Sequence, residues 1–336
     1  MTLQVDSWAV AGATSSEQIA RLNQQAATRS GNGVLGSGDL RVSELTVPGG
    51  AVDVAAGGFV ALGQEETFQG SYFGYNVGSA EVAINPTAGA VRSDLVILRV
   101  EDPNIDGTPW GHNPATDNVY YFRVIEGVSG TETELPANTT GVVLARIDMP
   151  ANTAAVEQAY ITDLREMMDA RRQRTLRVQR GGTKSNGVDW DEAGNIVDPD
   201  FERWPQHDWT VTIPSWATQV QVLADWDNAF LKPTGSTAGT EDARGQLWIG
   251  LLGTEEVTTT PSAYNFNQTS TTNGYRCSAS NKDQIDIPAA LRGQTVDVRM
   301  YVMGTAGQNG RLVADEWANF SVDLEFLEVP APEASL

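Results

Sequence analysis

The sequence has little of the chemistry from which most active sites are built. In 336 residues it contains one cysteine, Cys277, and two histidines, His112 and His207. A single cysteine excludes an intrachain disulfide, and two histidines exclude a zinc site made mainly of imidazoles. Since no histidine lies near Cys277 in the sequence, we expect a buried or inert thiol and two surface histidines.

Long apolar runs are also missing. No segment approaches the ~20 consecutive apolar residues that a membrane-spanning helix needs. The first 18 residues lack both the basic start and the sustained apolar core of a secretory signal. We therefore expect a protein without a signal peptide or membrane insertion, which is made in a cytosol and, if it acts outside a cell, leaves by assembly or lysis.

Positive charge is scarce, because 22 lysines and arginines face 43 acidic residues and the net charge is −21. Nucleic-acid binders carry a basic surface, so this balance argues against a nucleic-acid partner. One short segment, 171–182, departs from it, with five arginines and no acid. It predicts a junction that either docks a partner or neighbouring copy, or is a solvated linker whose arginines pair with nearby acids.

No catalytic motif stands out. There is no G-x-S-x-G elbow around a nucleophilic serine. Asp225 and Asp227, beside Trp226, are the best candidates for the carboxylate pair of a glycosidase. A solvated strand face explains them better, so we predict no catalytic residue, and a polysaccharide-degrading enzyme is the least favoured alternative.

Metal ligands are equally sparse. Asp189, Asp191 and Asn195 place oxygen atoms at intervals that suit calcium. Their spacing does not match the EF-hand loop, and an acidic turn without metal is the favoured interpretation. We expect neither a metal nor another cofactor.

Three segments repeat a pattern of an apolar stretch, an arginine, then valine or isoleucine and an acid. They are residues 94–102, 120–127 and 142–150. The arginines Arg99, Arg123 and Arg146 are 24 and 23 residues apart. Short apolar runs closed by turn residues predict strands of an all-β core. We expect each arginine at a strand end, in an exposed pair with Glu101, Glu126 or Asp148 respectively.

The rest of the chain follows the same mainly β class. Helical spacing predicts a short helix over 15–29, and alternation from 208 onward predicts an antiparallel sandwich of the jelly-roll sort. The expected parts are a lead-in over 1–35, a β domain over 36–166, an Arg-rich helix or linker with an acidic loop over 167–207, a β-sandwich over 208–330 and a frayed tail over 331–336.

Within the Arg-rich part, residues 165–173 are a candidate for a short helix. Its methionines are expected either against sister helices at a multimer axis or over the base of their own domain, the latter slightly favoured. The junction and multimer candidates are Arg165, Met167, Met168, Arg171, Arg172, Arg174 and Arg177.

Three segments, residues 36–72, 92–103 and 142–166, carry a family resemblance, and the segment from 208 carries it more loosely. They resemble the minor tail or baseplate proteins of siphophages that infect actinobacteria. It implies a tail-attachment domain in the N-terminal half and an outer domain that faces the host. It also implies a virion component, with other tail proteins as partners and a homotrimer as the favoured assembly.

Tryptophan is concentrated in the second half, where seven of the nine lie. Exposed tryptophans stack on sugar rings, whereas buried ones fill sandwich cores. We expect most of the seven in the core or an interface. Trp190, Trp204 and Trp226 are the candidates for contact with a cell-surface glycan, which would make the chain a receptor-recognition module.

Overall fold

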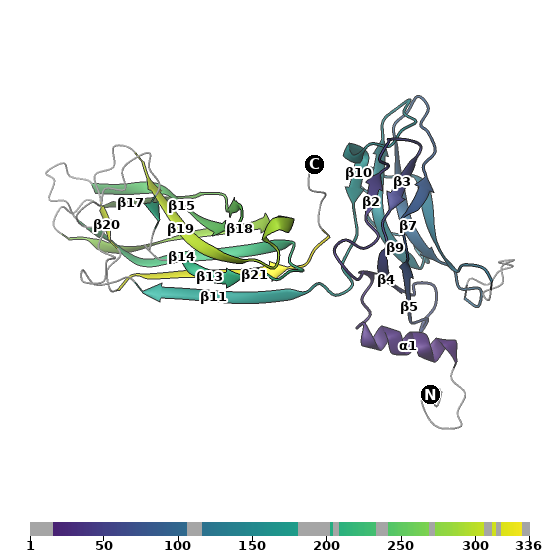
Figure 1. Cartoon of the computed structure of the whole chain (residues 1–336), viewed down its shortest axis with the longest axis horizontal. Helices are drawn as coiled ribbons and strands as arrows, with labels where there is room; N and C mark the ends of the chain where they lie inside the picture. The colour runs from purple at the N-terminus through teal and green to yellow at the C-terminus, as the bar shows by residue number, and fades with distance from the viewer. Residues whose placement is uncertain are drawn as a thin grey trace, which may run out of the picture. The chain divides into compact units, whose positions relative to one another are not determined.

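The computed structural model describes residues 16–105, 116–180, 202–203, 208–232, 241–268, 273–305, 311–313 and 317–330. The chain divides into two compact units, of which the second spans Arg171–Glu328. Antiparallel sheets build both units, and one short α-helix precedes them in sequence (Figure 1). The expected mainly β class is therefore confirmed.

Three sheets form the first unit. One sheet has the order β1-β4-β5, another β2-β3-β6, and the largest β10-β9-β7-β8. The bounds are β1 Gly33–Val34, β2 Val42–Glu44, β3 Ala51–Val54, β4 Gly57–Leu62, β5 Ser71–Asn76, β6 Ala80–Ala83, β7 Arg92–Val100, β8 Tyr120–Val128, β9 Gly141–Met149 and β10 Ile161–Asp163, with a 3-10 turn at Gln158–Tyr160.

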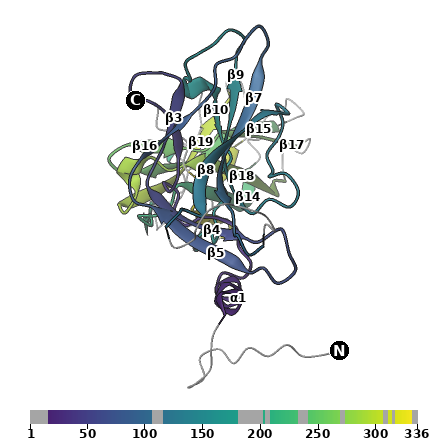
Figure 2. The same cartoon turned by 90° about the vertical axis from the view of Figure 1, so that its right-hand side faces the viewer.

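The predicted N-terminal helix is present as α1, Glu17–Ala27. It begins at Ser16, whose hydroxyl oxygen accepts the Ile19 N–H at 3.2 Å and so satisfies a free amide of the first turn. It ends where Arg29 and Ser30 take positive φ angles of 52° and 60°. The helix lies beside β5 (Figures 1 and 2).

The three sheets share one apolar core. It contains Val52 of β3, Phe59 of β4, Val96 of β7 and Leu144 of β9, none more than 1% exposed. Gly74 of β5 faces the Phe59 ring, and a Cβ at this position would lie 2.6 Å from a ring carbon. A glycine is therefore required where β5 crosses the core.

The second unit is a two-layered sandwich. One sheet has the order β11-β21-β14-β18, with β20 on β14, and the other β12-β19-β15-β16, with β13 on β19 and β17 on β15. The bounds are β11 Arg172–Arg180, β12 Glu202–Arg203, β13 Trp209–Thr212, β14 Gln219–Lys232, β15 Glu241–Leu252, β16 Glu256–Thr258, β17 Ser262–Gln268, β18 Tyr275–Asp286, β19 Thr295–Gly304, β20 Arg311–Val313 and β21 Asn319–Leu327, with a 3-10 turn at Ala289–Leu291.

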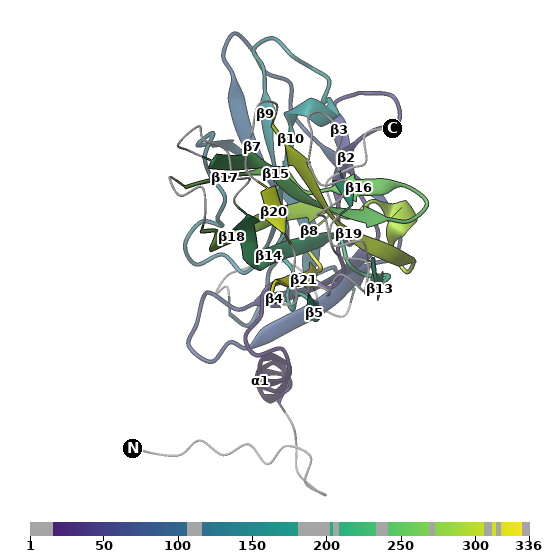
Figure 3. The same cartoon turned by 90° about the vertical axis from the view of Figure 1, so that its left-hand side faces the viewer.

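Alternate residues of both sheets meet between the layers. Figure 3 shows strands of the two sheets, among them β14 and β18 of one and β15 and β19 of the other. On β21 the alternate residues are Phe320, Val322, Leu324 and Phe326, all at most 1% exposed. Trp226 of β14 stacks on Phe320 with ring centroids 6.1 Å apart. Period-two alternation thus produces the sandwich core that the sequence predicts.

The Arg-rich segment corrects the predicted organisation. Residues 172–180 are a strand that pairs with β21 along its whole length, not a helix or linker. The predicted helix over 165–173 is also wrong, because Met167 forms a parallel bridge with Val34 and β11 begins at Arg172. Pairing with β21 overrides the helical preference of this stretch, and the second unit therefore begins at Arg171 rather than at 208.

Candidate functional site

The described residues offer little catalytic chemistry. Within them, no group of three histidine, cysteine or acidic side chains is placed to hold a metal ion. Cys277 is buried, and this burial raises its pKa to about 12, so the thiol stays protonated at neutral pH. His112, His207 and the calcium candidates Asp189, Asp191 and Asn195 lie outside the described residues.

The predicted carboxylate pair lies on the sandwich. Asp225 is half-buried and Asp227 is exposed, both on β14. Their neighbours across the strands are Ser280 and Ser321 for Asp225, and Asn319 for Asp227. This polar surface agrees with the solvated strand face that the sequence analysis favours.

The three repeated segments form one continuous sheet in the order β9-β7-β8. Arg146 lies opposite Leu95 and Arg123 opposite Ile97, so both project from the β7 face that also bears Arg99. The predicted pair of Arg146 with Asp148 is confirmed, at 3.0 Å between Nε and Oδ1.

The prediction for Arg99 needs correction. Its side chain is 8% exposed, and its Nη1 lies 2.6 Å from Oε1 of Glu65, which is 9% exposed. The expected partner, Glu101, lies farther away, with 3.8 Å between Arg99 Nε and Glu101 Oε1. The loop between β4 and β5 brings Glu65 over the strand, a contact that local sequence spacing does not reveal.

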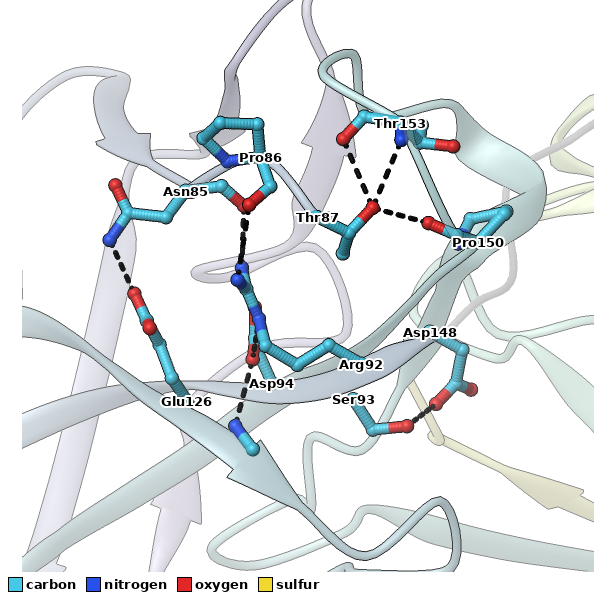
Figure 4. A network of polar contacts seen from close by, with 11 residues as sticks. Asn85, Pro86, Thr87, Arg92, Ser93, Asp94, Glu126, Asp148, Pro150 and Thr153 are labelled. Atoms are coloured by element: carbon cyan, nitrogen blue, oxygen red, sulfur yellow. Dashed lines mark hydrogen bonds and ion pairs between the residues drawn. The ribbon is translucent and has the colours of Figure 1, made fainter. Parts of the chain in front are cut away.

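A polar network at the start of β7 fixes the neighbouring loops (Figure 4). Asp94 is completely buried and accepts two hydrogen bonds from Arg92 Nε, at 2.8 and 2.9 Å. It also accepts the Gly127 N–H at 3.0 Å, while Arg92 Nη2 donates to the Asn85 carbonyl at 2.5 Å. The ion pair therefore ties the loop after β6 to β7 and β8.

A second network holds helix α1 against the first unit. Arg21 Nη1 lies 3.1 Å from Asp102 Oδ2, and Arg21 Nε donates to the Gln69 carbonyl at 2.8 Å. The Tyr72 hydroxyl donates to the same carboxylate at 2.8 Å. Burial, reinforced by Asp102, raises the pKa of Tyr72, so the phenol remains a donor.

A cleft of about 350 Å³ lies beside the loop between β8 and β9. Its walls include Asn32, Gln64, Glu134, Asn138 and Glu166, and no lining residue is aromatic. The two carboxylates are exposed. The cleft is suited to small polar groups, and it lacks the aromatic platform that a sugar ring would stack on.

The predicted junction residues lie in two places. Arg165 is buried and donates to the carbonyls of Ser37 and Asp39 at 3.1 and 2.7 Å. Met167 packs half-buried against the first core, and Met168 is half-buried beside it in sequence. These three side chains therefore belong to the first unit.

The other junction residues lie on or next to β11, along the edge of the sandwich. Arg171 forms two hydrogen bonds with Glu328, at 2.5 and 2.6 Å, and its guanidinium lies 5.2 Å from the centre of the Trp216 ring. Arg174 pairs with Asp323, and Arg172 lies 3.9 Å from Glu325. Arg177 donates to the Thr210 carbonyl at 3.4 Å. Arginines of this segment thus pair with nearby acids, as the linker alternative expects, but the segment that carries them is a strand.

Two apolar side chains on this strand were missed by sequence reasoning. Leu176 and Val178 are 55% and 60% exposed. The signal was their alternation within R-T-L-R-V-Q-R, which is a strand period. Together with the arginines they make β11 the candidate functional surface of the second unit.

The glycan candidates need one correction. Trp226 is completely buried and stacks on Phe320, so it cannot touch a sugar. Trp190 and Trp204 lie outside the described residues. Trp317, which we did not single out, is 66% exposed just before β21.

Comparisons with known proteins find distant likenesses only. No protein-family model matches the sequence, and no curated protein matches it. Among solved structures, the chain is similar to that of the infectious bursal disease virus Gt strain. The identity is 12%, the TM-score is 0.24, and the match covers 88% of this chain and 70% of that one. The match to a VP2 subviral particle of the same virus has 13% identity and a TM-score of 0.22, and it covers 89% of this chain and 70% of that one.

A third likeness is to a carbohydrate-binding protein. The N-terminal CBM22-1-CBM22-2 tandem domain of Paenibacillus barcinonensis Xyn10C gives 11% identity and a TM-score of 0.20, covering 88% of this chain and 99% of that one. All three TM-scores lie below the level of a shared fold. Among the described helices, none is long and apolar enough to span a bilayer.

Proposed function

We propose that this chain is a structural protein of a phage tail tip or baseplate. In this role the first unit anchors the chain among other tail proteins, and the sandwich is presented toward the host. The protein is a virion component assembled in the host cytoplasm, and a homotrimer is its favoured state. The resemblance of residues 36–72, 92–103 and 142–166 to siphophage tail proteins supports this role.

One structural observation carries the proposal. The segments with that resemblance form a β scaffold in which buried charges are paired internally, as Asp94 is with Arg92 and Glu65 with Arg99. Charges used in this way hold loops in place. Such a scaffold suits an assembly protein that must keep one shape.

The experiment combines particle composition with sedimentation. Tailed particles that carry this gene are purified and their proteins identified by mass spectrometry, and the purified chain is sedimented at micromolar concentration. The proposal expects the chain in the particles and a homomultimer in solution. A monomer that is absent from every purified tail would overturn it.

A second candidate function is recognition of a host cell-wall glycan by the sandwich. The exposure of Trp317 favours it, because a tryptophan at the surface offers a stacking face. Retention of the full chain on host cell walls, reduced by Trp317→Ala but not by Trp216→Phe, would support this function. If no wall fraction retains the chain, glycan recognition fails while the structural role stands.

A further inference from the structure

Strand β11 reverses the usual pattern of a sandwich strand. Antiparallel strands with one face on a core place apolar residues inside and polar residues outside. On β11 the exposed residues of the middle are Leu176 and Val178, whereas Thr175, Arg177 and Gln179 share the partly buried face. The partners of Leu176 and Val178 on β21 are Asp323 and Ser321, so both apolar side chains stand on the outer face.

The same residues expose backbone hydrogen-bonding groups. The Glu328 N–H donates to the Arg171 carbonyl at 3.0 Å, which makes this the first bonded pair of the β11–β21 ladder. Because bonded and non-bonded pairs alternate in an antiparallel ladder, the N–H and C=O groups of Arg174, Leu176 and Val178 point away from β21. Within the described residues, one weak contact reaches this row, from Arg177 Nη1 to the Leu176 carbonyl at 3.4 Å.

This edge lacks most of the devices that normally block strand addition. Proteins protect edges with prolines, bulges, short strands or covering segments. β11 has no proline, runs nine residues and pairs with β21 without a register shift. By contrast β18, at the other end of the same sheet, is bridged to the chain after β16 by the Thr260 N–H, which donates to Asp283 at 2.6 Å.

Charge decides which kind of strand can pair there. Two copies of β11 paired antiparallel about Arg177 would place Leu176 opposite Val178, but also Arg174 opposite Arg180. Like charges directly opposite each other destabilise a ladder. Arg174 already pairs with Asp323 on β21, so an acid opposite it would join an existing ion pair. An acid opposite the exposed Arg180 would meet an opposite charge, and a strand with both acids would still cover the apolar pair.

We propose that β11 is an acceptor edge for an extended, acidic segment of a partner protein, which adds to the sandwich as a further strand. The preferred segment has two apolar residues at alternate positions, flanked by acids with the same spacing. Main-chain hydrogen bonds would supply affinity, and the Arg174 and Arg180 positions would select for acids. The proposal does not depend on the role in a virion.

The first experiment uses the full chain and two fluorescein-labelled peptides, TETVTVTET and TKTVTVTKT. Both sequences read the same in either direction, so that strand polarity does not affect the pattern. We expect fluorescence anisotropy to show saturable binding of the acidic peptide and about tenfold weaker binding of the basic one, from two reversed cross-strand charge pairs. Equal affinity for both peptides, or no binding of the acidic one at about 1 mM, would overturn the proposal.

Two variants separate edge binding from general adhesion. Val178→Pro removes an N–H that faces the free edge and leaves the β11–β21 ladder intact, since proline is tolerated on edge strands. We expect it to weaken binding of the acidic peptide at least about tenfold, whereas the β-branched control Val178→Thr stays within about threefold. Far-UV circular dichroism checks that both variants are folded.

A charge reversal keeps the proposal falsifiable if the proline variant does not fold. Arg180 is exposed at the end of β11, so Arg180→Glu should leave the fold unchanged. We expect this variant to lose preference for the acidic peptide and to gain affinity for the basic one. An unchanged preference in Arg180→Glu, or wild-type affinity in a folded Val178→Pro, contradicts an acceptor edge.

Discussion

Arg99 and Glu65 form a buried ion pair, with 2.6 Å between Nη1 and Oε1. The same carboxylate oxygen accepts the Thr140 N–H at 3.1 Å, and Arg99 Nη1 donates to the Thr140 carbonyl at 2.9 Å. Three separate segments, the β4–β5 loop, β7 and the chain before β9, therefore meet at one pair. Loss of either charge would leave the other one buried without its partner.

We expect Arg99→Met to destabilise the first unit by about 3–5 kcal/mol, because the substitution leaves the Glu65 carboxylate buried without its partner. Adding Glu65→Gln to the same chain should recover a large part of this loss. Urea denaturation of the three proteins measures both effects. If Arg99→Met unfolds at the wild-type midpoint, the pair contributes nothing to stability.

Truncation of Trp226 should lower the free energy of unfolding far more than truncation of Trp317. Trp226→Ala removes a fully buried ring that stacks on Phe320 and should cost about 3–5 kcal/mol. Trp317→Ala, at a site 66% exposed, should change the free energy of unfolding by about 0.5 kcal/mol or less. Thermal unfolding followed by tryptophan fluorescence distinguishes the two. Similar losses in both variants would be inconsistent with the assigned burial.

Gly70 is predicted to be essential for docking of α1, and Gly78 provides the matched control. Gly70 has a φ of +85°, and a Cβ there would lie 2.5 Å from the Arg21 carbonyl carbon. Gly78 has open space around it. Gly70→Ala should cost about 1–3 kcal/mol and speed hydrogen exchange of the α1 amides, whereas Gly78→Ala should do neither. Slow exchange of α1 in Gly70→Ala would contradict the contact.

Cys277 should make the second unit less stable in alkali. Burial raises its pKa to about 12, whereas the pKa of a cysteine thiol in the unfolded chain is about 8.5. Between these values the unfolded chain releases a proton that the folded chain keeps, so stability falls as pH rises. Relative to Cys277→Ala, the wild type should lose stability above about pH 8.5 and show no such trend below it. Parallel stability curves up to pH 10 would contradict the buried thiol.

The fold was predictable where apolar residues recur along a strand at a regular period. The runs around Arg99, Arg123 and Arg146 are the strands β7, β8 and β9, and the alternation in 319–327 gives the inward face of β21. In these segments the core face follows from the side-chain period alone. The helix α1 was likewise predictable, because its polar cap and apolar spacing are local.

Contacts between distant segments were not predictable. Nothing near Arg99 in sequence indicates Glu65, which is 34 residues away. Residues 172–180 do alternate with a strand period, but nothing in their neighbourhood indicates that residues 319–327 are their partner strand. Trp226 seemed a surface candidate because acids flank it, but the two-residue period turns those acids outward and the ring inward.

The most direct test of the proposed tail role is a density map of intact tailed particles that carry this gene. We predict that the first unit fits density at the tail tip or baseplate, in a trimeric arrangement among other tail proteins, with the sandwich on the host-facing side. A map in which every density of the tail and baseplate is assigned to other chains would contradict it.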